Sequence, residues 1–246
     1  MRNRRTRVWF DGHELTAHAI VSDLRRPLVP RTASYVDVPG MDGKLFTGVR
    51  LDMRTVKLRL TLKGDPSERA QAQRALASIL NVSDYRPLEI SEDSGLYYMA
   101  IPTAKDDGSR FVRAESFEVT FDCQPCLRGM ARSFAFSLAA HESLSFVVGG
   151  TAPTPAFLTF THPSAGDLTL SLDTGTLVTE PDGGPSPMAM DSERRVYGEW
   201  SDAYQSITDV IALPMGADWA VLEPGARTLT ASAATSGTIS FIERWV

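Results

Sequence analysis

The fold is decided by one stretch of the first half, Thr55-Val56-Lys57-Leu58-Arg59-Leu60-Thr61-Leu62-Lys63, which is followed after Gly64 by Asp65-Pro66-Ser67-Glu68. Apolar and polar side chains alternate along the first segment, which is the period of a strand with one buried face. The second segment supplies an N-cap acceptor, a proline at the first helical position and a glutamate three residues after the cap, as in a capping box. We therefore predict a long strand over 49–63 and a helix from Pro66 to about Leu80.

The rest of the first half predicts strands and turns. Residues 8–21 have the pattern of a hairpin whose turn lies at Asp11-Gly12. Residues 24–34 contain two prolines and are better interpreted as an exposed loop or edge than as a central strand, and residues 36–44 form a turn cluster. Further strands are predicted over 86–90, 96–101 and 110–121. This half is expected to be mainly β with one helix.

The second half predicts many short strands. Residues 149–155 are rich in glycine and proline and have the composition of a connector that enters a second domain. Beyond them, short runs recur between turn signals such as residues 181–185, a spacing typical of a β-sandwich. The runs are 157–161, 168–172, 177–180, 188–190, 195–197, 219–222, 227–231 and 238–245, with 201–211 left ambiguous. We expect two domains, 1–130 and 131–246.

The charge of the 246-residue chain is −5 in total but unevenly distributed. From Gly150 onward there are four arginines, no lysine and 12 carboxylates, a net charge of −8, while the remainder carries +3. An acidic half argues against nucleic acid as its ligand, because phosphate binding depends on lysine and arginine. No apolar run approaches the roughly 20 residues that cross a bilayer, and no apolar segment follows the basic N-terminus. Neither a membrane anchor nor secretion through a signal is expected.

The two cysteines stand in the motif Cys123-Gln124-Pro125-Cys126, at the end of a predicted strand. Half a zinc site would need two more ligands at finger-like spacing, whereas His141 and His162 stand singly and far away. A redox pair would open a helix, and residues 127–129 start none. Two small buried hydrophobes are the preferred interpretation. So few cysteines also indicate synthesis in a reducing compartment.

The sequence contains no GxSxG nucleophile elbow, no HExxH zinc motif, and no P-loop or dinucleotide glycine pattern. His13 and His18 would lie on opposite faces of one strand, so joint metal binding is not expected. A carboxylate pair for glycoside hydrolysis stays open, because such a pair forms in space rather than in sequence. We predict no catalytic, cofactor or metal site, and we do not expect an enzyme.

The order of landmarks resembles that of the distal tail protein (Dit) family of siphophage-type tailed bacteriophages. The resemblance covers most of the chain. It rests on the order and spacing of the landmarks and not on one specific motif. Met41 stands where the family usually has arginine, and Ala226 where it usually has asparagine. The landmarks are Val38-Pro39-Gly40-Met41-Asp42-Gly43, the strand and single helix after it, 117–125, 149–156, 190–196 and 222–229.

The resemblance implies a structural virion protein whose six copies form a ring between the tail tube and the baseplate or tail tip. The N-terminal domain, a β-sandwich or split-barrel-like fold with one helix, would form the ring around the DNA channel. The C-terminal galectin-like sandwich would project outward. Implied partners are the tail tube protein, the tape measure protein and the tail-tip hub with its tail-associated lysin, with DNA only in transit. The protein would be made and assembled in the host cytoplasm and reside at the distal end of the tail.

A closed ring needs edge strands that pair between subunits, and the polar-faced strand over 49–63 is a candidate edge. The basic N-terminal cluster can meet phosphates, lie in solvent or form an interface, and we prefer contact with the neighbouring tube ring. The lumen is not expected to be strongly basic, since a basic channel would bind DNA and slow its exit. The candidate interface residues are Arg2, Arg4, Arg5, Arg7, Lys57 and Arg59.

The alternative function is a carbohydrate-binding module or an accessory adhesion protein without catalytic activity. Galectin-like sandwiches bind sugars, and Trp200, Tyr204 and Trp219 would offer stacking faces if they were exposed. Packing in a core or an interface is the preferred interpretation of these three rings.

Overall fold

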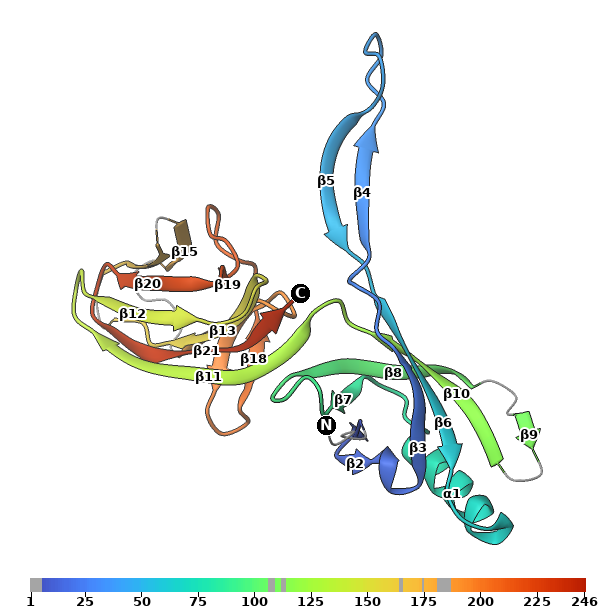
Figure 1. The fold of residues 1–246 in the computed structure, drawn as a ribbon. Helices are drawn as coiled ribbons and strands as arrows, with labels where there is room; N and C mark the ends of the chain where they lie inside the picture. The colour runs from blue at the N-terminus through green and yellow to red at the C-terminus, as the bar shows by residue number, and fades with distance from the viewer. Residues whose placement is uncertain (1–5, 106–108, 112–113, 164–165, 174, 181–186) are drawn as a thin grey trace. The chain divides into compact units, whose positions relative to one another are not determined.

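The computed structural model describes residues 6–105, 109–111, 114–163, 166–173, 175–180 and 187–246 (Figure 1). The chain divides into two compact units, which we call the first unit, Met1–Arg128 with Val246, and the second unit, Gly129–Trp245. Most described residues lie in strands, and the described residues contain one α-helix, so the prediction of a mainly β fold is confirmed.

The first unit is a sheet with one covering helix. Strand β6 lies between β10 and β3, and β10 pairs on its other side with β8, which continues through β7 to β1. Its elements are β1 (Val8–Phe10), β2 (His13–Glu14), the 3-10 turn η1 (Leu15–Ala17), β3 (Ala19–Arg25), β4 (Arg31–Val36), β5 (Leu45–Leu51), β6 (Arg54–Leu62), α1 (Pro66–Ile79), β7 (Arg86–Ile90), β8 (Tyr97–Lys105), β9 (Ser109–Phe111) and β10 (Ala114–Cys123).

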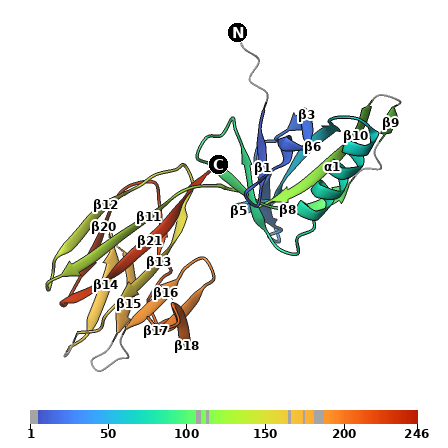
Figure 2. The same ribbon diagram turned by 90° about the horizontal axis from the view of Figure 1, so that it is seen from below.

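The predicted helix and its cap are confirmed. Asp65 Oδ1 accepts hydrogen bonds from the backbone N–H groups of Ser67 and Glu68, at 2.8 and 2.9 Å, and Glu68 Oε2 accepts one from the Asp65 N–H at 2.9 Å. The reciprocal bonds satisfy N–H groups that a helix start leaves without partners. Leu76 and Ala72 of α1 are buried in the same core as Leu58 of β6, and Figure 2 shows the helix along one face of β6 and β10.

The predicted long strand over 49–63 is wrong in one respect, because the chain leaves the sheet at Asp52 and Met53 and forms two strands, β5 and β6. Apolar side chains occupy odd positions before the break, as at Val49 and Leu51, and even positions after it, as at Val56 and Leu58. A shift of one residue turns a strand's apolar set to its other face, so one straight strand cannot bury both sets. The strand is also no edge, because β6 has a partner on each side.

The predicted hairpin over 8–21 is also corrected. Strand β1 pairs with β2 through a turn with Asp11 and Gly12 at φ values of 50° and 76°, as expected. The rest of that segment turns through η1, and β3 then pairs with β6 instead of β1. His13 and His18 consequently do not share a strand, because His18 follows η1.

Strands β4 and β5 form a separate two-stranded ribbon, which we call the arm (residues 31–51). Figure 1 shows the arm extending away from the other strands of the first unit. The predicted turn cluster lies at its tip between Val36 and Leu45, where Gly40 and Gly43 adopt φ values of 81° and 86° that favour glycine.

The second unit consists of two sheets that share one core (Figure 2). One sheet has the order β18-β17-β16-β13-β21-β11, and the other the order β12-β20-β14-β15. The rings of Phe146 on β12 and Phe241 on β21 lie 6.0 Å apart, so side chains of both sheets interdigitate. The strands are β11 (Leu127–Leu138), β12 (Ser143–Val148), β13 (Thr154–Phe160), β14 (Leu168–Leu172), β15 (Gly175–Glu180), β16 (Met188–Asp191), β17 (Val196–Ser201), β18 (Ser206–Val210), β19 (Val221–Leu222), β20 (Gly225–Ala231) and β21 (Thr235–Trp245).

Two expectations for this half change. Residues 149–155 were expected to lead into a second domain, but they lie inside the second unit, between β12 and the start of β13. The ambiguous residues 201–211 contain a strand, β18, which pairs with β17. The predicted turn at 181–185 lies outside the described residues.

Candidate interaction site

The arm has one apolar face. Its register places Ala33 opposite Val49, and Tyr35 opposite Phe46 after a β-bulge. Alternate residues of a strand share a face, so these four side chains lie on the same side of the ribbon. The rings of Tyr35 and Phe46 meet edge to face with centroids 5.9 Å apart, which agrees with that assignment.

The opposite face of the arm is polar over most of its length. Thr32 lies opposite Arg50 and Ser34 opposite Gly48. The arm is therefore amphipathic, like a strand pair that covers a core with one side and meets water with the other.

The apolar face of the arm is uncovered in the described chain. Tyr35, Phe46 and Val49 expose 57%, 55% and 54% of their surfaces, and Val36 and Leu45, which follow at the end of the ribbon on its other face, expose about as much. None of these residues belongs to either core. An isolated two-stranded hairpin is marginal in water, and a contiguous exposed apolar patch usually marks an interaction site.

The arm joins the rest of the first unit through two connectors, residues 26–30 and 52–53. The N–H of Asp52 donates to the carbonyl of Pro30 at 2.9 Å, so the connectors are bonded to each other. The Asp52 carboxylate also accepts a hydrogen bond from the Thr32 hydroxyl and lies 3.3 Å from the Arg50 guanidinium. These bonds close the base of the arm.

Each connector meets the rest of the first unit at an arginine. Arg26 begins the first connector, and its guanidinium donates to Asp93 Oδ2 and Glu92 Oε2, each at 2.5 Å. Burial opposes the charge of Arg26, but the hydrogen bond to Asp93 and the nearby carboxylates raise the pKa of the guanidinium above its ordinary value. Arg54 follows the second connector and is buried, and its Nε donates to the Pro125 carbonyl at 2.9 Å.

Three of the six predicted interface residues, Arg7, Lys57 and Arg59, lie within the described part of the chain. Arg2, Arg4 and Arg5 lie outside the described residues. Arg7 is exposed before β1, with its guanidinium 3.9 Å from Glu14 Oε1.

Lys57 and Arg59 share the outward face of β6. Lys57 Nζ donates to Glu118 Oε1 on β10 at 3.1 Å, whereas Arg59 is exposed. The sequence analysis did not predict the arm, although two signals were available. Pro27 and Pro30 precede the arm, and after it the apolar residues change from odd to even positions between Leu51 and Val56.

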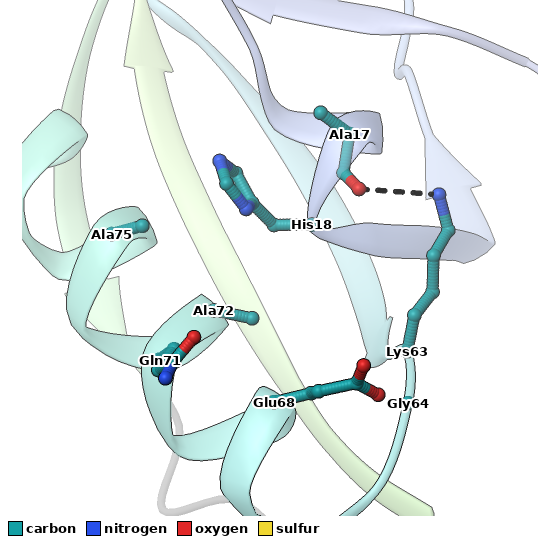
Figure 3. A pocket seen from close by; sticks show the side chains of 8 residues that line it. All are labelled: Ala17, His18, Lys63, Gly64, Glu68, Gln71, Ala72 and Ala75. Carbon is teal, nitrogen blue, oxygen red and sulfur yellow. Dashed lines mark hydrogen bonds between the residues drawn. The ribbon is translucent and has the colours of Figure 1, made fainter.

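A shallow cavity of about 500 Å³ lies between η1 and the first turns of α1 (Figure 3). Its charged side chains hold the local fold. Lys63 Nζ donates to the carbonyls of Thr16 and Ala17, at 2.5 and 3.5 Å, and Glu68 belongs to the capping box. These contacts explain both charges without a ligand.

The cysteine motif lies at the end of β10, where Cys123 is the last residue of the strand. Cys123 is buried in the first unit's core, and burial raises the pKa of its thiol to about 12. Neither cysteine forms a disulfide bond, and Cys126 is half-buried. A thiol with so high a pKa is a poor nucleophile and metal ligand. Among the described residues, no group of three or more His, Cys, Asp or Glu side chains is placed to hold a metal ion.

The three candidate stacking rings do not form a sugar platform. The Trp200 ring packs edge to face on Phe157 at 5.3 Å, and its Nε1–H donates to Asp202 Oδ1 at 2.8 Å. Trp219 packs against the second unit's core, and Tyr204 alone is largely exposed. Within the described part of the chain, no helix is long and apolar enough to cross a membrane.

One family model and several solved structures are similar to this chain. Residues 14–123, which include the arm, match the family model described as phage tail protein RIFT-related domain. The Dit protein (gp 19.1) of phage SPP1, described as a paradigm of the hub adsorption apparatus in phages that infect Gram-positive bacteria, matches with a TM-score of 0.74 at 17% identity, over 98% of this chain and 99% of that chain. A chain of the phage p2 baseplate in its activated conformation with Ca matches with a TM-score of 0.45 at 11% identity, over 96% and 97%. No curated protein matches the sequence.

Proposed function

We propose that this chain, whose residues 14–123 match the phage tail protein RIFT-related domain and whose fold is similar to that of SPP1 Dit, is a structural phage tail protein that acts as a ring-forming connector. Six copies form a closed ring that joins the tail tube to the baseplate or tail tip, and DNA passes through its lumen. The partners are the chain itself, the tail tube protein, the tape measure protein and the tail-tip hub with its tail-associated lysin.

The uncovered apolar face of the arm carries this proposal. Phe46 and Val49 are just over half exposed, so burial of the remaining surface would gain roughly 0.8–1.6 kcal/mol for each residue, and neither belongs to a core of the described chain. A neighbouring copy is the occupant we favour, because the arm belongs to the matched tail domain and every copy would carry one arm. A contact of one surface with a different surface of the next copy closes into a ring when the rotation permits.

The two predicted domains receive different roles. Residues 1–130 form the ring, and residues 131–246, a galectin-like sandwich, project outward. The charge distribution supports the division, since the chain from Gly150 onward carries −8 and the remainder +3. A near-neutral ring suits a channel from which DNA must leave quickly, because a strongly basic lumen would hold phosphates through counterion release.

The basic N-terminal residues contact the neighbouring ring of the tail tube in this proposal, and the outward face of β6 contributes Lys57 and Arg59. A structure of the assembled tail that placed the Arg2–Arg7 segment on the lumen wall would contradict the assignment. Reversal of one tube-facing charge, as in Arg59→Glu, would reduce the attachment of tube to ring while the mass of the ring stayed constant.

The first test is the mass of the purified chain by light scattering after size exclusion. Six copies of the 26.9 kDa chain weigh about 161 kDa. The double variant Tyr35→Ser, Phe46→Ser removes the aromatic pair of the arm and should run as a monomer. Its matched control is Tyr204→Ser, Val147→Ser, because these side chains of the second unit are at least as exposed.

A wild-type chain that stayed monomeric at its highest soluble concentration would contradict self-assembly through the arm. Equal masses for the arm variant and the control would show that the ring closes through another surface.

A further inference from the structure

The connectors at the base of the arm lie outside the strand ladders and would be the natural place for a hinge. Residues 26–30 join β3 to β4, and residues 52–53 join β5 to β6. Figure 1 shows both segments running between the arm and the sheet of the first unit. Short segments that end elements can absorb large changes in φ and ψ, so without further contacts the arm would swing.

Two prolines make the first connector stiff but do not set its direction. Pro27 and Pro30 fix their own φ angles and restrict the residues before them. Leu28, between them, exposes 91% of its surface and holds nothing in place. The direction of the connector therefore depends on what binds its first residue.

Arg26 is held by two carboxylates on one rigid turn. Its Nη1 and Nη2 reach Asp93 and Glu92, which follow β7. That turn is closed by the Asp93 N–H on the Ile90 carbonyl at 2.9 Å and by the Leu96 N–H on the Asp93 carbonyl at 2.9 Å. Charge-assisted bonds from two nitrogens of one guanidinium fix its orientation as well as its position.

The surroundings of this cluster favour a stronger contact than an ordinary surface pair. Arg26 and Asp93 each expose 26% of their side chains, and Glu92 Oε1 accepts a further hydrogen bond from the Thr6 hydroxyl at 2.7 Å. Tyr98 lies nearby, and burial raises the pKa of its phenol, so it stays neutral at physiological pH. Exposed pairs contribute little, whereas partly buried pairs are less screened.

We propose that Arg26 is the positioning residue of the arm: its double ion pair with Glu92 and Asp93 latches the first connector and presets the arm in the direction from which it meets its neighbour. The latch deepens the proposed ring function and rests on it. An arm that is already in place loses less conformational entropy on assembly than one that must be ordered. Arg54 fixes the second connector from within the core, so the two arginines hold the two roots of the arm.

The experiment measures the direction of the arm in the isolated chain. Nitroxide labels are placed at the tip and on the body, through Met41→Cys and Ser83→Cys in a Cys126→Ser chain, and the distribution of their separation is recorded by pulsed electron resonance. The latch predicts a narrow distribution of label separations in the chain that keeps Arg26. In the Arg26→Gln variant the distribution should be at least twofold broader. Arg25→Gln is the matched control, since Arg25 is the adjacent arginine, is 69% exposed and pairs only with Asp23 two residues before it among the described contacts.

A second variant breaks the latch from its other side. Glu92→Gln with Asp93→Asn leaves Arg26 intact and should broaden the distribution to the same extent, so the test does not depend on one variant folding. A distribution that remains narrow in either latch variant, or that broadens equally in Arg25→Gln, overturns the proposal.

The consequence for assembly is read from the mass of each variant against concentration. Arg26→Gln should need at least a tenfold higher concentration than Arg25→Gln to form the ring. A wild-type chain that never assembles would refute the proposed ring, yet the label distances would still decide whether Arg26 sets the arm. The two proposals can therefore fail separately.

Discussion

The arm and the ribbon β3–β6 are two halves of one long hairpin, but they bury their apolar residues in opposite ways. In β6, Val56, Leu58 and Leu60 have no exposed surface and belong to the core of the first unit. In the arm, Phe46 and Val49 are more than half exposed. The hairpin thus packs on the core of its own chain through β3 and β6, and by our proposal it packs on a neighbouring copy through the arm. Alternation of apolar and polar residues along a strand predicts that one face will be buried. It does not predict whether the same chain or another chain buries that face.

Chemical access should differ most between the two halves. Cys123 on β10 is buried and its thiol has a pKa of about 12, so in the folded chain it carries very little thiolate at pH 8. A thiol introduced on the arm by Val49→Cys should have an ordinary pKa of about 8.5. In a Cys126→Ser chain we expect iodoacetamide to alkylate the arm thiol roughly a thousandfold faster than Cys123. Similar rates in a folded chain would show that β10 opens readily.

Truncation should separate the halves by stability. Leu58→Ala on β6 should lower the free energy of unfolding by about 2–5 kcal/mol, because it removes buried methyl groups and leaves a cavity. Phe46→Ala on the arm should change it by less than about 0.5 kcal/mol in the monomer, since the ring is mostly solvated. Urea unfolding at low protein concentration checks both. A large loss for Phe46→Ala would mean that the arm already packs on its own chain.

The cap of α1 offers a smaller effect on the body. Asp65→Ala should destabilise the first unit by about 1 kcal/mol, because two helix N–H groups lose their acceptor. Asp37→Ala is the control, since Asp37 is also an exposed aspartate but lies on the arm, in a surface pair with Lys44. Asp65→Ala should therefore unfold at a lower temperature than Asp37→Ala. Equal unfolding midpoints would argue that the capping box does not contribute to the stability of the first unit.

The smallest effect is expected for the cross-strand pair of Lys57 and Glu118. Lys57→Ala should cost less than about 0.5 kcal/mol, as exposed ion pairs usually do. A double-mutant cycle with Glu118→Ala measures the pair alone. A loss comparable to that of Leu58→Ala would show that the outward face of β6 also determines the stability of the body.

Local signals in the sequence predicted local structure well. The capping box at Asp65 fixed the start of α1, because all its donors and acceptors lie within four residues. The turn at the tip of the arm was also predicted, since glycine and proline act on their own backbone. Short strands of the second half were found for the same reason.

Pairing over long distances was not predicted. Whether β6 is central or an edge depends on β3 and β10, whose partners are set by the whole sheet and leave no mark in residues 54–62. The break at Asp52 was visible only as a change of phase from Val49 to Val56. The ion pair of Arg26 could not be predicted for a similar reason, because an arginine that pairs with a turn 66 residues away, as Arg26 does with Glu92, looks like any other arginine in the sequence.

The continuity of the hairpin has a mechanical consequence. A pull on the arm along its length is transmitted through the connectors to β3 and β6, and β6 is held to β10 by eight register pairs. Ladder hydrogen bonds run perpendicular to the strands, so such a pull loads them together in shear and not one after another as in unzipping. Strain on the proposed contact between copies would thus be shared by all the hydrogen bonds between β6 and β10.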